Sequence, residues 1–177
     1  MTNYSVFNTA NKPIYVQQTN TYVSPAIESM PDLSAASAGR LFTLTTGNVS
    51  AGGGANLLLQ VVNPAASTRT IYLSQIIGGS TAAASLIVYN GGILTGGTTP
   101  VPVNNNFGNS VTSAVTTQQV TGTVTGSPVT LMSIPLTAGA YNIQLRGSVI
   151  VPPGRSVTIS IGPGSLTGSI NLTWWEV

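Results

Sequence analysis

The chain has 177 residues, which is enough for one domain with a sizeable core and too few for two. Only 5% of the residues are charged, five Lys or Arg and three Asp or Glu, against roughly 25% in an ordinary soluble domain. Because the five cations are scattered, whereas phosphate recognition needs them clustered, we expect no nucleic-acid partner. So few charges are typical of a subunit that is assembled or outside the cell, although hydroxyls and amides can also keep a monomer soluble.

Residues 1–38 differ from the rest and are predicted to form an N-terminal arm or connector. The β-prone residues of the arm are Ile14, Tyr15, Val16, Tyr22 and Val23. Two interpretations stay open: a surface tail, or an arm that adds its strand to the sheet edge of a neighbouring subunit. The arm lacks the basic and apolar regions of a secretory signal, and no run reaches the roughly 18 apolar residues of a membrane helix, so we expect no membrane insertion.

Residues 39–177 are predicted to form the folded domain, because short β-prone runs alternate there with Gly, Pro and Asn. The run 56–63 is apolar enough for a strand buried on both faces. Pro135 interrupts the run 128–136, which therefore predicts an edge or bulged strand. Residues 100–110 are too rich in Pro and Asn for a central strand and predict a long crossover loop. The other predicted strands are 41–46, 70–77, 85–89 and a weakly patterned segment within 112–124.

The most regular pattern lies in residues 139–177. Apolar and polar residues alternate at 141–146, 156–161 and 170–175, the period of a half-buried strand. Two turns, Pro152-Pro153-Gly154 and Gly162-Pro163-Gly164, separate these runs. We therefore expect three antiparallel strands with one apolar face, and we expect the upstream strands to supply the opposing sheet.

These evenly punctuated strands predict an all-β fold, a single jelly-roll or Greek-key sandwich behind an extended N-terminal arm. The long crossover favours the jelly roll. An immunoglobulin-like sandwich is the alternative, although its Cys…Trp…Cys pattern is absent.

Trp174 and Trp175 are neighbours on a predicted strand, so they must point to opposite faces. Trp174 shares a face with Ile170 and Leu172 and is predicted to be core. Trp175 is then either an aromatic that caps the edge of the sandwich or an anchor at a subunit interface, where indoles are enriched.

The residues that usually carry chemistry are scarce. The chain has no His and no Cys, so we expect no catalysis, no cofactor and no metal. Glu28 and Asp32 fall in the arm, which would hold a catalytic carboxylate pair poorly. Glu176 is predicted to be solvated or to pair with an Arg. Ser50 lies in no nucleophile motif and has no base to activate it.

Turn and core motifs over residues 56–177 form a recognisable series: Asn63-Pro64, Arg69-Thr70-Ile71-Tyr72-Leu73, Asn104-Asn105-Asn106-Phe107-Gly108, Val151-Pro152-Pro153-Gly154-Arg155-Ser156-Val157-Thr158 and Trp174-Trp175-Glu176. The series resembles small β-sandwich proteins encoded by spore-forming Gram-positive bacteria and their phages. An arm before a jelly roll is also similar to the subunits of endospore appendages. That resemblance implies polymerisation by insertion of an N-terminal connector into a neighbour, although those connectors carry cross-linking cysteines and this chain has none.

The expected function is therefore that of a non-enzymatic structural subunit. It would self-assemble, as a homo-oligomer or helical homopolymer, into an extracellular or cell- or spore-surface fibre through its arm and its sheet edges. One alternative is a fibre or decoration module associated with a phage or capsid. Another is a carbohydrate-binding sandwich whose glycan contact uses exposed aromatics such as Trp175, Tyr141 or Tyr89.

Overall fold

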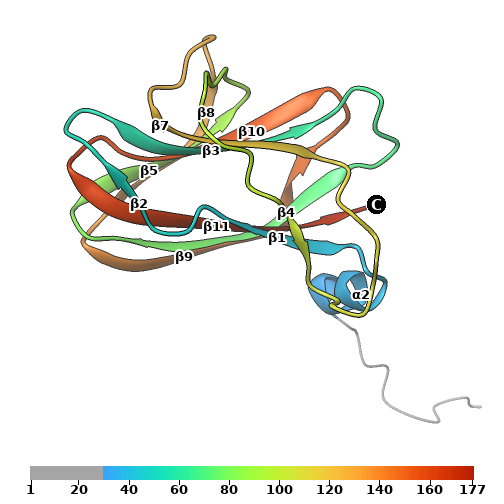
Figure 1. The fold of residues 1–177 in the computed structure, drawn as a ribbon. Helices are drawn as coiled ribbons and strands as arrows, with labels where there is room; N and C mark the ends of the chain where they lie inside the picture. The colour runs from blue at the N-terminus through green and yellow to red at the C-terminus, as the bar shows by residue number, and fades with distance from the viewer. Residues whose placement is uncertain (1–29) are drawn as a thin grey trace, which may run out of the picture.

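The computed structural model describes residues 30–177, which form two antiparallel β-sheets packed face to face with one short helix beside them (Figure 1). In chain order the elements are α2 (Pro31–Ser37), β1 (Leu41–Thr45), β2 (Val49–Ala51), β3 (Asn56–Asn63), β4 (Ile71–Ser80), β5 (Ala84–Asn90), β6 (Val103–Asn104), β7 (Thr116–Gly122), β8 (Val129–Leu136), β9 (Gly139–Val151), β10 (Arg155–Gly162) and β11 (Leu166–Glu176).

Sheet A has the strand order β6-β1-β11-β4-β9, with β2 also pairing with β11, and sheet B has the order β7-β3-β10-β5-β8. Without the flanking strands, the orders β1-β11-β4-β9 and β3-β10-β5-β8 remain. From β8 to β11 each successive strand lies in the other sheet, which is the arrangement of a jelly roll. The predicted jelly-roll sandwich is confirmed.

The prediction that the last three strands form one unit is wrong. β9 and β11 both lie in sheet A but are separated by β4, and β10 lies in sheet B between β3 and β5. The turns on either side of β10 cross from one sheet to the other and do not close hairpins. A period of two tells which side chains face the core, but both sheets share that core, so the pattern cannot assign a strand to its sheet.

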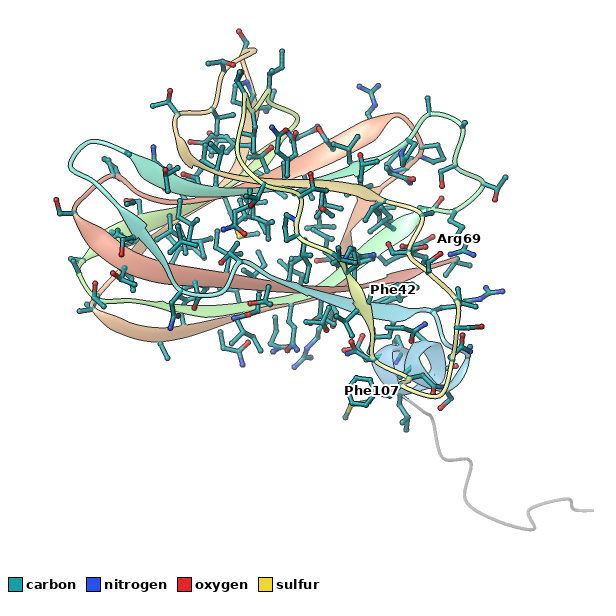
Figure 2. The ribbon with its side chains drawn as sticks, viewed as in Figure 1. Phe42, Arg69 and Phe107 are labelled. Atoms are coloured by element: carbon teal, nitrogen blue, oxygen red, sulfur yellow. The ribbon has the colours of Figure 1, made fainter. Side chains whose placement is uncertain are left out.

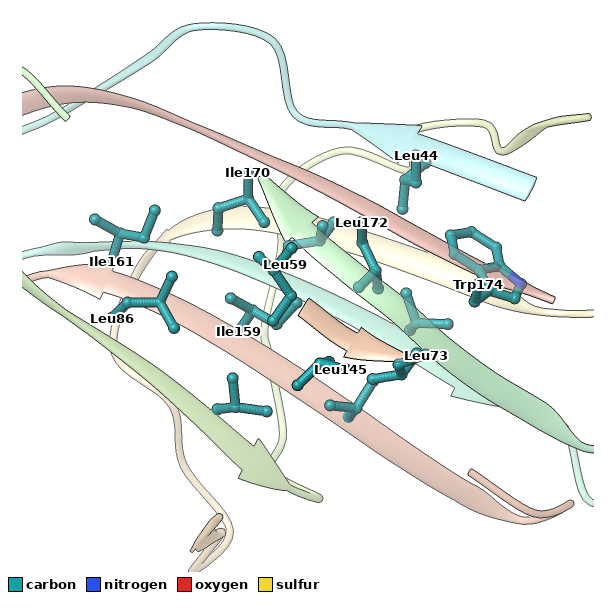
Figure 3. Close-up of a cluster of buried hydrophobic side chains, with 14 of the residues drawn as sticks. Leu44, Leu59, Leu73, Leu86, Leu145, Ile159, Ile161, Ile170, Leu172 and Trp174 are labelled. Atoms are coloured by element: carbon teal, nitrogen blue, oxygen red, sulfur yellow. The ribbon is translucent and has the colours of Figure 1, made fainter. Parts of the chain in front are cut away.

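The core is a continuous aliphatic layer between the two sheets, and Figure 3 shows the side chains meeting there. Trp174 is fully buried, as predicted, and stacks against Phe42 of the neighbouring strand with a centroid separation of 6.2 Å. Inward positions on β11 and β10 supply Ile170, Leu172 and Ile159. Burying one such side chain contributes about 1.5–3 kcal/mol, which is why the alternating pattern is a reliable guide to burial.

β3 is buried on both faces, which confirms the prediction for residues 56–63. Its outer face is covered by the segment between β5 and β6. Thr98 of that segment forms a β-bridge with Gln119 of β7, the edge strand next to β3. Gln60, on that covered face, donates hydrogen bonds to the Gly92 carbonyl and the Thr158 hydroxyl. This covering segment satisfies the polar groups of the buried face.

α2 occupies the end of the predicted arm and packs against sheet A near β1 and β11 (Figure 1). Pro31 is at its start, where a missing N–H costs nothing. Asp32 accepts a hydrogen bond of 2.6 Å from Ser74 of β4, which ties the helix to the sheet. Residues 1–29, including Ile14, Tyr15, Val16, Tyr22, Val23 and Glu28, lie outside the described residues.

Candidate functional site

The longest open sheet edge in residues 30–177 is β9, a strand of 13 residues whose partner within that range is β4. Residues 139–144 pair with β4 one for one, from Ser80 to Gln75, without a bulge. They contain no charged residue and no Pro, the usual protections of an edge. Within residues 30–177 their outer side has no partner strand, so it offers N–H and C=O groups to another strand.

The other edges are shorter or better protected. β6 has two residues, and Pro135 lies near the end of β8, as the sequence predicted for an edge strand. β7 is bridged at Gln119 by the segment that covers sheet B. The open part of β9 ends at Arg146 and Gly147, which both have positive φ and lie where its register against β4 shifts.

A groove of about 470 Å³ runs between the edge of sheet A and sheet B. Its walls are the end of β9 on one side and β5, β8 and β10 on the other. The lining includes Tyr89, Leu131, Ile150, Arg155 and Val157. Leu131 is 52% exposed and Ile150 is 53% exposed. Arg155 is the only charged residue in the lining. The groove is thus largely apolar and open to solvent.

An aromatic pair stands on the outer face of sheet A. Trp175 lies on the opposite face from Trp174, as predicted, and stacks on Tyr72 of the adjacent strand with a centroid separation of 5.7 Å and an interplanar angle of 4°. Gly147 approaches the indole so closely that a Cβ there would lie 2.4 Å from a ring carbon of Trp175. Tyr72 could not be predicted as the partner of Trp175, because the register between strands is not visible in a single strand.

The three aromatics proposed as a glycan platform do not come together. Tyr141 packs against the core and donates a 2.7 Å hydrogen bond to the Ser169 carbonyl. Burial raises the pKa of the Tyr141 phenol above its ordinary value. Tyr89 lines the groove on sheet B, and Trp175 belongs to the outer face of sheet A. Tyr141 is therefore not an exposed aromatic, and Tyr89 and Trp175 could contact a glycan only on separate surfaces.

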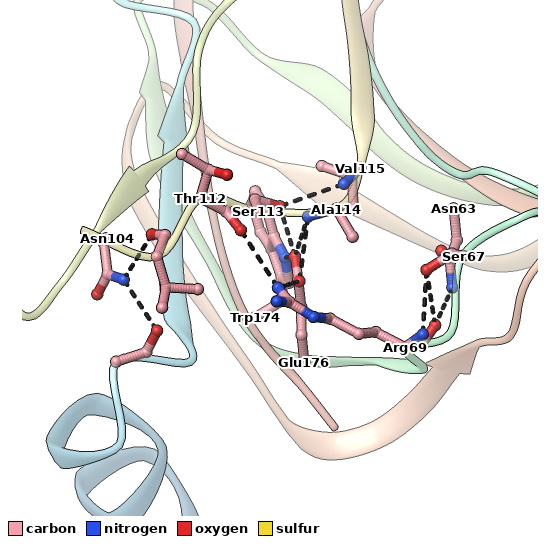
Figure 4. Close-up of polar contacts among 12 residues, drawn as sticks. Asn63, Ser67, Arg69, Asn104, Thr112, Ser113, Ala114, Val115, Trp174 and Glu176 are labelled. Carbon is pink, nitrogen blue, oxygen red and sulfur yellow. Dashed lines mark hydrogen bonds and ion pairs between the residues drawn. The ribbon is translucent and has the colours of Figure 1, made fainter. Parts of the chain in front are cut away.

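Glu176 is the most connected polar side chain of the described region (Figure 4). It is fully buried, so the expectation of a solvated residue is wrong and the alternative, a pair with an Arg, is confirmed. Arg69 approaches one carboxylate oxygen at 2.9 Å. Ser113, the Ala114 N–H and the Trp174 indole N–H, the last at 3.2 Å, donate the remaining hydrogen bonds.

This buried carboxylate fastens the long crossover to the end of β11. The same Arg69 guanidinium also donates to the Thr112 carbonyl at 3.2 Å. Period-two alternation could have found the burial, because Glu176 continues the inward series of Ile170, Leu172 and Trp174. The cluster has a structural role, since its donors occupy both carboxylate oxygens and leave no open position for a substrate.

Other residues with potential chemistry have structural roles. Ser50 shares a 2.9 Å hydrogen bond with the Thr167 hydroxyl. Across residues 30–177, no three acidic residues gather as a metal site would require. Over the same range, no helix is long and apolar enough to cross a membrane.

Comparison of the chain with family models, with curated proteins and with solved structures finds no match. The candidate site therefore consists of what the geometry provides: the open edge of β9, the groove beside it and the aromatic pair on sheet A.

Proposed function

We propose that this chain is a structural subunit of an extracellular or cell- or spore-surface fibre. In this proposal the segment 14–23 of one copy adds a strand to a sheet edge of the next copy. Head-to-tail addition of this kind gives an open filament when the rotation between successive copies does not close a ring.

The open edge of β9 carries the proposal. Its flat part, residues 139–144, has free backbone groups and none of the charges or prolines that discourage pairing. An added strand would extend sheet A beyond β9 and satisfy those groups. The low charge of the chain favours close approach of copies, because there is little repulsion to overcome.

Chain length permits the contact. Seven residues lie between Val23 and Pro31 at the start of α2, which makes eight steps from one Cα to the next. An extended chain spans about 3.3 Å per step, so Val23 can lie up to about 26 Å from the helix. α2 lies near β1, which is three strands from β9, or about 14 Å across the sheet. Reach therefore allows the arm to pair with its own β9 or with that of a neighbour, and the experiment must separate the two.

The test compares the full chain with a variant that lacks residues 2–29 and keeps α2, because Asp32 and Ser74 tie that helix to the sheet. Negative-stain microscopy and sedimentation are expected to show filaments for the full chain and monomers for the deletion. Filaments that persist after the deletion would exclude the arm mechanism. Discrete closed oligomers of the full chain would favour the phage or capsid module.

A pair of point variants provides a matched control. Val16→Asp places a charge within the segment 14–23, whereas Thr9→Asp adds the same charge to the arm outside that segment. Filament formation is expected to fail for Val16→Asp and to persist for Thr9→Asp. If the full chain is a monomer at high concentration and cysteines placed at residues 16 and 142 of one chain cross-link within it, the arm pairs with its own sheet and the fibre proposal is wrong.

The aromatic pair supports a second candidate, saccharide binding. Trp175 and Tyr72 stand on the face that also carries the hydrogen-bonded amides of Gln75, Asn142 and Gln144. Aromatic faces with neighbouring amides suit the apolar and hydroxyl groups of a neutral sugar. A glycan array with wild type and Trp175→Ala tests it, and signals that survive the substitution exclude this surface.

A further inference from the structure

A single aromatic side chain is displayed on the loop that follows β6. Phe107 is 91% exposed and lies beside α2 in Figure 2. Isolated exposed apolar residues are common, but a phenyl ring with so little contact to its own chain contributes almost nothing to folding. The exposed apolar residues Met30 and Leu33 belong to the start of α2.

The loop that carries Phe107 is held in place by hydrogen bonds. The Asn104 amide donates to the Gly39 carbonyl at 2.9 Å and to the Val111 carbonyl at 3.0 Å. Asn106 accepts a bond from the Gly108 N–H, and its own carbonyl accepts one from the Asn109 N–H at 2.9 Å. The ring is therefore presented on an ordered turn, so this loop would lose little conformational entropy on binding a partner.

We infer that Phe107 of one copy inserts into the groove between β9 and sheet B of a second copy. The groove has about 470 Å³, which is enough to admit an aromatic side chain, and Tyr89, Leu131, Ile150 and Val157 supply part of its walls. This inference rests on the proposed function and identifies a second contact between the same subunits.

The sheet topology excludes insertion into the groove of the same chain. Phe107 follows β6, which is one edge of sheet A, whereas the groove borders β9, the opposite edge. Four strand spacings of about 4.8 Å separate the two edges, or about 19 Å. Because Asn104 ties the loop to Gly39, between α2 and β1, the ring cannot cross the sheet. A projection and a recess on opposite edges of one molecule make a head-to-tail contact between copies.

The position of the arm favours a second copy as the occupant. The 29 residues outside the described region join the chain at Met30, at the start of α2, so the end of the molecule that carries Phe107 is also the end from which the arm departs. The arm and Phe107 can therefore contact the same neighbouring copy.

The test measures assembly of the full chain against concentration. Phe107→Ser and Leu131→Arg are each expected to raise the concentration for half-assembly about 30-fold, as the loss of a buried anchor does. Ile93→Ser is the matched control, because Ile93 is also exposed, at 59%, but lies outside the groove. It is expected to stay within about twofold of wild type. Unchanged thermal melting of Phe107→Ser would show that folding is intact.

Cross-linking tests the pairing directly, because the chain has no native Cys. Chains carrying Phe107→Cys are mixed with chains carrying Leu131→Cys and treated with a short bismaleimide. A covalent heterodimer is expected, and a mixture of Ile93→Cys with Leu131→Cys should give none. Cross-linking of Phe107→Cys chains to one another in place of the heterodimer would overturn the inference, because it indicates a symmetric contact.

The outcomes separate the inference from the proposed function. If deletion of residues 2–29 abolishes assembly and Phe107→Ser does not, the fibre proposal stands and this inference is wrong. If the deletion still assembles but Phe107→Ser does not, the arm mechanism is wrong and the inference stands. A full chain that remains monomeric at every concentration refutes both.

Discussion

Replacement of Glu176 by Ala tests how the end of the sandwich is held together. The carboxylate is 0% exposed and accepts hydrogen bonds from Ser113, Ala114 and Trp174 as well as an ion pair from Arg69. Its loss leaves the buried indole N–H of Trp174 without a hydrogen-bond acceptor, which costs about 1–3 kcal/mol of stability. It also removes the contacts that hold the segment of Ser113 and Ala114 to β11. We expect a loss of about 3–5 kcal/mol in the free energy of unfolding, as for other broken buried pairs.

Replacing Arg69 should lower the free energy of unfolding less than replacing Glu176 does. The Arg69 side chain is 37% exposed, so in Arg69→Gln water compensates part of the lost interaction and three neutral donors still hold the carboxylate. We expect about 1–2 kcal/mol for Arg69→Gln. Urea denaturation measures both variants, and thermal melting should fall by about 6–20 °C for Glu176→Ala. If Arg69→Gln costs as much as Glu176→Ala, charge attraction and not the neutral donors holds the site, and this reasoning is refuted.

Two further predictions concern Tyr141 and Gly147. Since burial raises the folded-state pKa of Tyr141 above the unfolded value near 10, its contribution to stability is complete below pH of about 10 and falls by up to about 1.4 kcal/mol per pH unit above it. Tyr141→Phe should remove that slope in denaturation series between pH 9 and 11, and an unchanged slope would contradict the assignment. Gly147→Ala should cost about 1–3 kcal/mol because of its φ of 81° and the contact with Trp175, whereas Gly122→Ala, with open space around it, should stay within about 0.5 kcal/mol by the same denaturation assay.

Local patterns in the sequence were sufficient for the strands and for the direction of their side chains. The run 56–63 and the opposite faces of Trp174 and Trp175 follow from hydrophobicity and the period of two, which are properties of a few adjacent residues. The edge position of β8 followed from Pro135, because a missing N–H is a local fact.

Long-range relations were not available from one sequence. Whether β10 lies in sheet A or sheet B depends on partners about 100 residues away, such as Leu59 opposite Ile159, and nothing in the strand itself records them. The stacking of Trp175 on Tyr72 likewise depends on register between strands. The burial of Glu176 was accessible from alternation, but its charge suggested solvent. Three of the four donors that make its burial tolerable, those of Arg69, Ser113 and Ala114, come from segments distant in sequence.

The placement of β11 between β1 and β4 has a consequence for biosynthesis. Sheet A joins Leu41, near the start of the described region, to Trp175, near its end, so the sheet stays divided until the ribosome has released β11. Until then β4 and β9 can pair, but β1 has no central strand to join them. A nascent chain therefore lacks a finished sandwich until β11 has emerged, and newly made copies become competent to bind one another only after that point.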